Sequence, residues 1–148
     1  MNTLFLVDNS VSQRLHNPIV RTAWSTLSER GEIATCLPTI LEAGYSARSA
    51  HAHRETIHFE QASKMVLPPT SEDLPIAVRL QGALFTVFTA GMGRAVGVSD
   101  LQIAATAIQH SKGDTQVVVV HYDTDFDHLA SVEPRLATEW IVPRGSVA

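Results

Sequence analysis

The sequence predicts an α/β fold in which a mainly parallel sheet is flanked by helices on both faces. Apolar runs rich in β-branched residues occur at 3–7, 32–36, 116–121 and 138–142, without regular alternation with polar residues. Such runs are typical of parallel strands, because both faces of the strand are buried. The segments between them have helical periodicity, as crossover connections require. A chain of 148 residues can bury a sizeable core, so we expect one domain over 1–148.

Local signals place two helices in the first third of the chain. Asn17-Pro18 opens a helix that runs to Arg30, and Gly31 ends it as a residue that tolerates positive φ. Pro38 opens a second helix, which carries Glu42. Proline suits both openings because the first helical position makes no use of its backbone N–H.

Four more helices are expected further along the chain. They are predicted at 53–66, 73–90, 100–111 and 126–130. Pro68-Pro69 ends the first of them, and Ser99 with Gln102 forms a capping box for the third. The segment 91–97 between the second and the third is a glycine-rich turn.

The composition is that of an ordinary globular protein, with 45% hydrophobic and 18% charged residues. The net charge of -4 gives no overall basic field for nucleic acid, although divalent cations would neutralise a local cluster of acids. The one cysteine, Cys36, excludes an internal disulfide and a cysteine-based zinc site. The N-terminal apolar run lacks a basic segment and is broken by Asp8, so we expect neither a signal peptide nor a membrane span, and a cytoplasmic location.

Two of the predicted strands end in carboxylates. Asp8 follows the run 3–7, and Asp123, Asp125 and Asp127 follow the run 116–121. The carboxyl edge of a parallel sheet is the usual place for ligands in open α/β folds. Each acid has a simpler explanation as a helix cap or a solvated turn residue, and that alternative remains open for each one alone.

Two further acids interrupt apolar helical stretches. Glu42 lies within Ile40-Leu41-Glu42-Ala43, and Asp100 opens a helix that is apolar nearly all round. An exposed helical glutamate and an acid that complements the helix dipole are the alternatives. Together with Asp8 and Asp123, however, these acids form a set of oxygen donors suited to a hard divalent cation such as Mg²⁺.

In this order, the residues resemble the PIN domain, and specifically the VapC-type ribonuclease toxins of bacterial toxin–antitoxin pairs. The matching segments are Leu6-Val7-Asp8-Asn9-Ser10, Leu41-Glu42, Asp100-Leu101-Gln102-Ile103-Ala104-Ala105-Thr106-Ala107, Val119-Val120-His121-Tyr122-Asp123-Thr124-Asp125-Phe126 and Glu139-Trp140-Ile141. The resemblance covers nearly the whole chain. It implies a PIN-like three-layer sandwich with a central, mainly parallel sheet.

The resemblance also implies roles for particular residues. Asp8, Glu42, Asp100 and Asp123 would be the catalytic acids, with Asp8, Asp100, Asp123 and Asp125 as ligands of Mg²⁺ or of Mn²⁺ in its place, and with Ser10 as a supporting hydroxyl. The fourth acid is preceded by His121, where many relatives carry threonine. The family further implies RNA as the substrate, a cognate antitoxin as protein partner, and a homodimer.

Arg14 is the residue that we expect to contact the RNA backbone, because it follows the Asp8 turn on the next helix. Tyr45 and the other aromatic residues at helical spacings are expected in the core or at a dimer contact rather than beneath bases. The leading hypothesis is therefore a metal-dependent endoribonuclease. The alternative is a non-catalytic PIN-like binding or scaffold module whose acids only cap helices.

Overall fold

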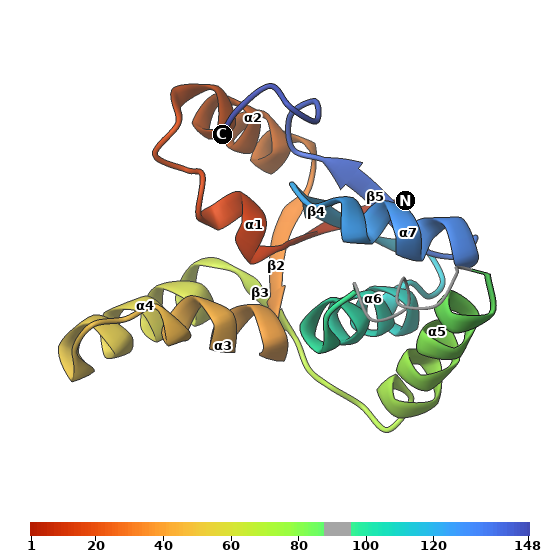
Figure 1. Cartoon of the computed structure of the whole chain (residues 1–148). Helices are drawn as coiled ribbons and strands as arrows, with labels where there is room; N and C mark the ends of the chain where they lie inside the picture. The colour runs from red at the N-terminus through yellow and green to blue at the C-terminus, as the bar shows by residue number, and fades with distance from the viewer. Residues whose placement is uncertain (88–95) are drawn as a thin grey trace.

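The computed structural model describes residues 1–87 and 96–148, which contain a five-stranded parallel sheet (Figure 1). Its strands are β1 (Asn2–Val7), β2 (Glu32–Cys36), β3 (Met65–Leu67), β4 (Thr115–His121) and β5 (Ala137–Trp140). They lie in the order β3-β2-β1-β4-β5, and every neighbouring pair is parallel. The α/β class with a central parallel sheet is confirmed.

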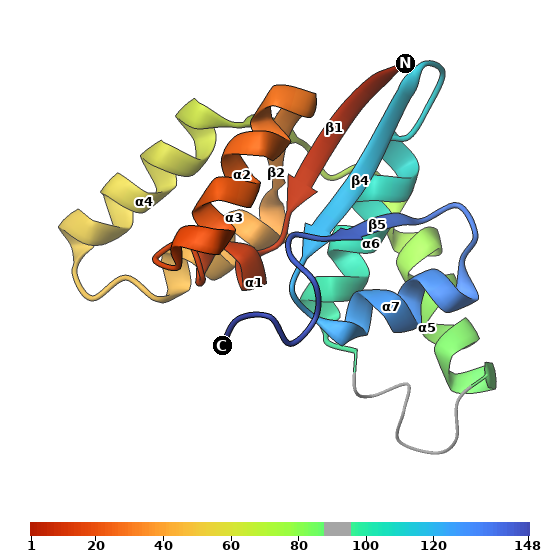
Figure 2. The same cartoon turned by 90° about the horizontal axis from the view of Figure 1, so that it is seen from above.

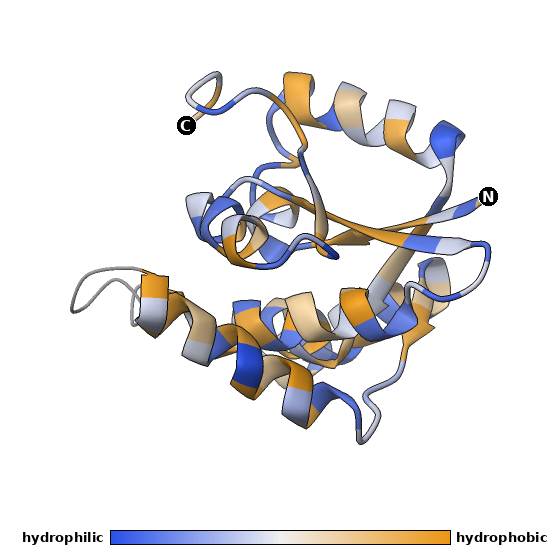
Figure 3. Cartoon of the chain, turned by 90° about the vertical axis from the view of Figure 1, so that its right-hand side faces the viewer, coloured by the Kyte–Doolittle hydropathy of each residue, from blue (hydrophilic) through white to orange (hydrophobic). Residues whose placement is uncertain are grey.

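Helices cover both faces of the sheet. They are α1 (Asn9–Ser12), α2 (Pro18–Arg30), α3 (Leu37–Tyr45), α4 (Ala50–Ser63), α5 (Asp73–Val87), α6 (Val98–His110) and α7 (Thr124–Val132). In the central strand, Leu4 and Leu6 join a core with α5, α6 and α7, while Phe5 and Val7 join a second core with α1 and α2. Figure 3 shows the apolar strands between these two helical layers, as the three-layer sandwich requires. The helices α3 and α4 pack on each other and project from the body of the molecule (Figure 1).

The structure departs from the expected elements in the helix predicted over 53–66 and in the capping box predicted at Ser99. The helix predicted over 53–66 ends at Ser63, and Met65–Leu67 instead pairs with β2 as a fifth strand. Three residues are too few to show a periodicity, so this strand depends on its partner. The capping box is also wrong, because α6 starts at Val98 with Gly97 as its N-cap. The predicted helix end 88–90 and most of the turn 91–97 lie outside the described residues.

Gly31 ends α2 as predicted, but for a different reason. Its φ of -178° is extended backbone that any residue adopts. A Cβ at this position would lie 2.5 Å from the Thr3 carbonyl oxygen and 2.9 Å from the Phe5 ring. The close approach of α2 to β1 therefore excludes a side chain here.

Among the helices of the described ranges, none combines the length and the apolar character needed to cross a membrane.

Candidate active site

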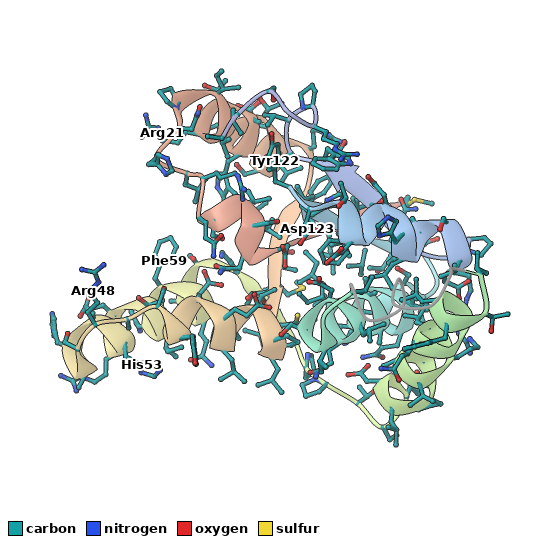
Figure 4. The ribbon with its side chains drawn as sticks, in the orientation of Figure 1. Arg21, Arg48, His53, Phe59, Tyr122 and Asp123 are labelled. Carbon is teal, nitrogen blue, oxygen red and sulfur yellow. The ribbon has the colours of Figure 1, made fainter. Side chains whose placement is uncertain are left out.

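Asp8 and Asp123 lie side by side at the carboxyl edge of the sheet, because β1 and β4 are adjacent and end together (Figure 2). The Asp8 N–H donates to the Val120 carbonyl at 2.9 Å, which continues the ladder to the end of the strand. Figure 4 shows Asp123 just beyond β4, between α1 and α7 in that view. The two strand-end acids thus meet, although 115 positions separate them in the sequence.

Asp8 and Asp123 each cap a helix through one carboxylate oxygen, and the other oxygen of each takes no part in the cap. Asp8 Oδ2 accepts from the Ser10 N–H at 3.1 Å, and Asp123 Oδ1 accepts from the Asp125 N–H at 2.9 Å. Asp8 is only 4% exposed, and its other oxygen, Oδ1, is buried with no hydrogen-bond partner in the described structure. A buried carboxylate oxygen without a partner is costly unless a cation compensates it.

Two helices bring the remaining acids to the same pocket. The helix α3 follows β2 directly and so starts at the same edge of the sheet, and α6 begins there before the chain returns through β4. Asp8, Glu42, Asp100 and Asp123 line one pocket of about 370 Å³. The Oε1 atom of Glu42 is also buried without a hydrogen-bond partner in the described part of the chain.

Three of the carboxylates come closest to one another. Asp100, Asp123 and Asp125 each offer an oxygen, and these oxygens all lie within 4.8 Å of one another. Asp125 does not line the pocket of the other four acids, but it joins the cluster from the first turn of α7. Within the described ranges, no lysine or arginine forms an ion pair with these groups, and His128 Nδ1 lies 4.0 Å from Asp125.

Burial and the crowding of like charges raise the pKa values of Asp100, Glu42 and Asp125. Burial first, and then Asp8, Asp123, Asp125 and Glu42, raise the pKa of Asp100 to about 8. Burial and the neighbouring acids also raise the pKa of Glu42 and of Asp125. A divalent cation would reverse this repulsion, because it favours the ionised form of every carboxylate around it.

The donor set therefore fits a hard divalent metal ion. All the candidate ligands are carboxylate oxygens, which Mg²⁺ and Mn²⁺ prefer, and the Oδ1 atom of Asp8 is buried without a hydrogen-bond partner in the described structure. Among the described residues, this group of ligand atoms contains no cysteine or histidine, which are the ligands typical of structural zinc sites.

Ser10 makes hydrogen bonds both to Asp8 and to the backbone beside Asp123. Its N–H donates to Asp8, and its Oγ accepts from the Tyr122 N–H at 2.9 Å. One residue thus holds the Asp8 turn against the backbone next to Asp123. This is a structural basis for a supporting role of Ser10.

The buried side chain of His121 accepts a hydrogen bond from the backbone of Asp123. The imidazole is fully buried against Phe126 and Trp140, and its Nδ1 accepts from the Asp123 N–H at 3.2 Å. Burial lowers the pKa of His121, which favours the neutral ring, and the hydrogen bond from the Asp123 N–H requires that Nδ1 carries no proton. A histidine at this position therefore orients the fourth acid through its backbone.

We predict that His121→Leu weakens Mn²⁺ binding more than His121→Asn does. Leucine leaves the buried Asp123 N–H unpaired, whereas the asparagine Oδ1 can accept in place of Nδ1. Calorimetric titration with Mn²⁺ measures the difference, which should be several-fold in affinity. Thermal unfolding in EDTA separates the packing loss that both variants share. Equal Mn²⁺ affinities in the two variants would contradict a positioning role.

Arg14 is engaged with its own chain rather than with the pocket. Its Nη1 donates to the Ser10 carbonyl at 2.7 Å, its Nε donates to the Ala148 carbonyl at 3.0 Å, and the guanidinium lies 4.6 Å from the Tyr122 ring centroid. The arginine does not line the acid pocket. Contact with RNA stays a prediction for this residue.

The pocket wall contains polar residues that the sequence analysis did not select. Asn9, Gln13 and Ser99 line it beside the acids. Asn9 and Gln13 are four residues apart, at the start and just after the end of α1, so they share a face. That spacing was the signal that could have identified Gln13.

Comparison with known proteins identifies the family to which the chain belongs. Residues 6–132 match the family model of the PIN domain, and the chain belongs to this family. It is 36% identical over 147 residues to ribonuclease VapC21 of Mycobacterium tuberculosis, covering 99% of both chains. It is 35% identical over 143 residues to ribonuclease VapC51 of the same organism, covering 97% of this chain and 96% of that relative.

Solved structures of VapBC complexes have the same fold. VapBC-1 from nontypeable Haemophilus influenzae matches with a TM-score of 0.71 and 14% identity, over 93% of this chain and 98% of that one. A DNA-bound VapBC from Salmonella typhimurium matches with a TM-score of 0.66 and 19% identity, over 96% and 100% of the two chains. The resemblance to VapC-type PIN domains is confirmed.

Proposed function

We propose that the protein is a metal-dependent endoribonuclease, the toxin of a toxin–antitoxin pair, which hydrolyses RNA phosphodiesters. The observation that carries this proposal is the pocket in which four carboxylates meet, two of them with buried oxygens that lack a partner. It occurs in a chain whose relatives over nearly their whole length are ribonucleases. We further propose that residues 1–148 act as one domain around this pocket.

Asp8, Asp100, Asp123 and Asp125 are the proposed ligands of Mg²⁺, for which Mn²⁺ can substitute. A divalent ion supplies Lewis acidity that makes water nucleophilic at neutral pH and offsets the negative charge of the phosphate. The chain itself supplies the arrangement: Ser10 holds Asp8 against the end of β4, and His121 holds the backbone of Asp123.

Glu42 is the proposed acid that handles a proton rather than only binding metal. Burial and the charge of Asp8 raise its pKa, so its carboxyl holds a proton closer to neutral pH than a free glutamate does. Its buried Oε1 lies on the wall of the pocket, free of hydrogen bonds to the described residues.

The alternative of a non-catalytic module is not favoured. Its acids would serve only as helix caps, and Asp8 and Asp123 do cap α1 and α7. Glu42, however, caps nothing, because it lies in the interior of α3, and Asp100 stands three residues after the N-cap Gly97. Caps alone therefore do not explain why four acids share one pocket.

We extend the proposal to a cognate antitoxin, a second copy of the chain, and a cytoplasmic location. The solved structures compared above are VapBC complexes. An apolar groove of about 410 Å³, lined by residues of α3, α5 and α6, includes the exposed Leu74, Val78 and Val98. Such a groove suits a second copy, and light scattering of the purified protein measures whether the mass is twice 16.1 kDa.

The proposal is tested by incubating the protein with single-stranded RNA in Mg²⁺, in Mn²⁺ and in EDTA. We expect cleavage with either ion and none in EDTA, with recovery when Mn²⁺ is added back. Asp8→Asn should be inactive in all three conditions. Asp114→Asn is the matched control, because this exposed acid precedes β4 at the opposite edge of the sheet. Undiminished cleavage in EDTA, or by Asp8→Asn, would overturn the proposal.

A further inference from the structure

A second pocket adjoins the acid pocket on the side of α3. It has a volume of about 500 Å³ and is bounded by α3, by the N-terminal turn of α6, and by Asn9 and Gln13. Four residues line both pockets, namely Asn9, Gln13, Glu42 and Ser99. The two pockets are therefore neighbouring compartments of one site rather than separate cavities.

We propose that this second pocket binds the nucleobase next to the scissile phosphate, with Tyr45 as the stacking surface and the amides of Asn9, Gln13 and Gln102 as contacts to the base edge. This inference rests on the proposed ribonuclease function and adds to it the residues that recognise the substrate.

The polar residues of the pocket suit a base better than a phosphate. In the described part of the chain, the side-chain amides of Asn9, Gln13 and Gln102 make no hydrogen bond to protein groups. Each amide carries both a donor and an acceptor, as the edges of the bases do. Among the residues that the structure describes, no lysine or arginine lines this pocket and Glu42 is its one charged residue, so these residues offer no cationic partner to an anionic phosphate.

Tyr45 has the position and the exposure of a stacking surface. It is 94% exposed, so it does not belong to the core, and the dimer contact that was the other expectation for it stays a prediction. It lies three residues after Glu42 on α3 and hence on the same helical face as that acid. Leu41 and Pro38 also line the pocket, so its apolar floor can take the flat face of a base. Stacking on an aromatic ring needs an unpaired base, which implies single-stranded RNA as substrate.

Glu42 lines both pockets, so the proposed base pocket lies directly beside the pocket that would hold the scissile phosphate. A phosphate held among the carboxylates would place an adjacent base beyond Glu42, in the pocket of Tyr45. A pocket of about 500 Å³ has room for one base with its ribose. The pocket therefore fits one nucleotide that flanks the cut.

The test combines variants of the protein with a change in the RNA. A single-stranded RNA with a mapped cleavage site is compared with two versions that carry an abasic residue on one or the other side of the cut. For the wild type, we expect one abasic version to raise KM roughly tenfold or more, from the loss of one stacked base. Tyr45→Ala should raise KM similarly on the intact RNA and show little further loss with that abasic version. Tyr45→Phe, which keeps the ring, should restore the response.

Phe59→Ala is the matched control. Phe59 is also an exposed aromatic residue, at 62%, but it lies on α4 and does not line the pocket. Figure 4 shows its ring standing out from that helix. We expect this variant to cleave the intact and abasic RNAs as the wild type does. Circular dichroism and Mn²⁺ titration check that each variant is folded and binds metal.

The outcomes separate this inference from the proposed function. Failure of the wild type to cleave the intact RNA in Mn²⁺ would overturn both. Cleavage that is insensitive to both abasic changes and to Tyr45→Ala would overturn the base pocket alone. A Tyr45→Ala variant that changes only the mass in light scattering, or only the affinity for an antitoxin, would make Tyr45 a protein contact and would likewise overturn it.

Discussion

Asp100→Asn is expected to abolish Mn²⁺ binding and to lower RNA cleavage by roughly a hundredfold or more, while it stabilises the metal-free protein. Asp100 belongs to the group of three acids, with Asp123 and Asp125, whose oxygens all lie within 4.8 Å of one another. An asparagine oxygen carries no full charge, so it is a weak ligand for a hard cation. Burial and four neighbouring acids raise the pKa of Asp100 to about 8, so the metal-free folded protein must keep this carboxyl protonated at neutral pH, where the unfolded chain ionises it. Asparagine removes that free-energy cost of folding.

This prediction is specific to a metal centre because the same substitution should lower Mn²⁺ binding and RNA cleavage but raise the stability of the metal-free protein. Calorimetric titration measures Mn²⁺ binding, gel assays measure cleavage, and thermal unfolding in EDTA measures stability. Asp127→Asn is the matched control from the same acidic turn, because its Oδ1 accepts from Trp140 Nε1 at 3.1 Å and asparagine keeps that acceptor. If Asp100→Asn retained Mn²⁺ affinity, or if it destabilised the metal-free protein as an ordinary core change does, the assignment would be wrong.

The affinity for Mn²⁺ is expected to rise by up to about tenfold per pH unit as the pH approaches 8, and then to level off. Below about pH 8, Asp100 in the metal-free pocket holds a proton, which the metal must displace. The raised pKa values of Glu42 and Asp125 act in the same direction. Titrations at pH 6, 7 and 8 measure the effect, and Asp100→Asn should lose most of it.

The stability of the metal-free protein should fall as the pH rises, whereas the affinity for Mn²⁺ should increase. The pKa of Asp100 is higher in the folded than in the unfolded chain, so the folded state binds more protons between about pH 4 and 8. The free energy of unfolding therefore falls as the pH rises through that range. Saturating Mn²⁺ should remove this decline, because it stabilises the ionised cluster. A metal-free melting temperature that increases from pH 5 to 8 by the same amount in wild type and Asp100→Asn would contradict the raised pKa.

Much of the fold could be predicted because its signals are local. The strands β1, β2 and β4 follow from apolar runs, and α2 follows from Asn17-Pro18 and Gly31. The strand β3 could not be predicted, because its three residues are extended only where they pair with β2. Ser99 was predicted to cap the helix 100–111, but α6 starts two residues earlier, at Val98, and this leaves Ser99 on the wall of the pocket.

The candidate site could be predicted as a set of residues but not as an arrangement. The acids stand at strand ends and on apolar helices, which the sequence displays directly. The arrangement depends on contacts between residues more than a hundred positions apart. Examples are the bond from the Tyr122 N–H to Ser10 and the bond from Arg14 to the Ala148 carbonyl. Tyr45 was expected in the core or at a dimer contact, since a helical spacing does not reveal which face remains exposed.

The sequence by itself determined the class of fold, the order of the acids along the chain and the resemblance to VapC-type PIN domains. These depend on the alternation of apolar runs and on short motifs, which are properties of neighbouring residues. The tertiary structure alone decided which carboxylate oxygens are buried without a partner, which carboxylates approach within 4.8 Å and which polar side chains extend the pocket toward Tyr45. Those properties arise when the parallel strands bring distant turns to one edge, where burial and like charge act on groups that are not neighbours in sequence.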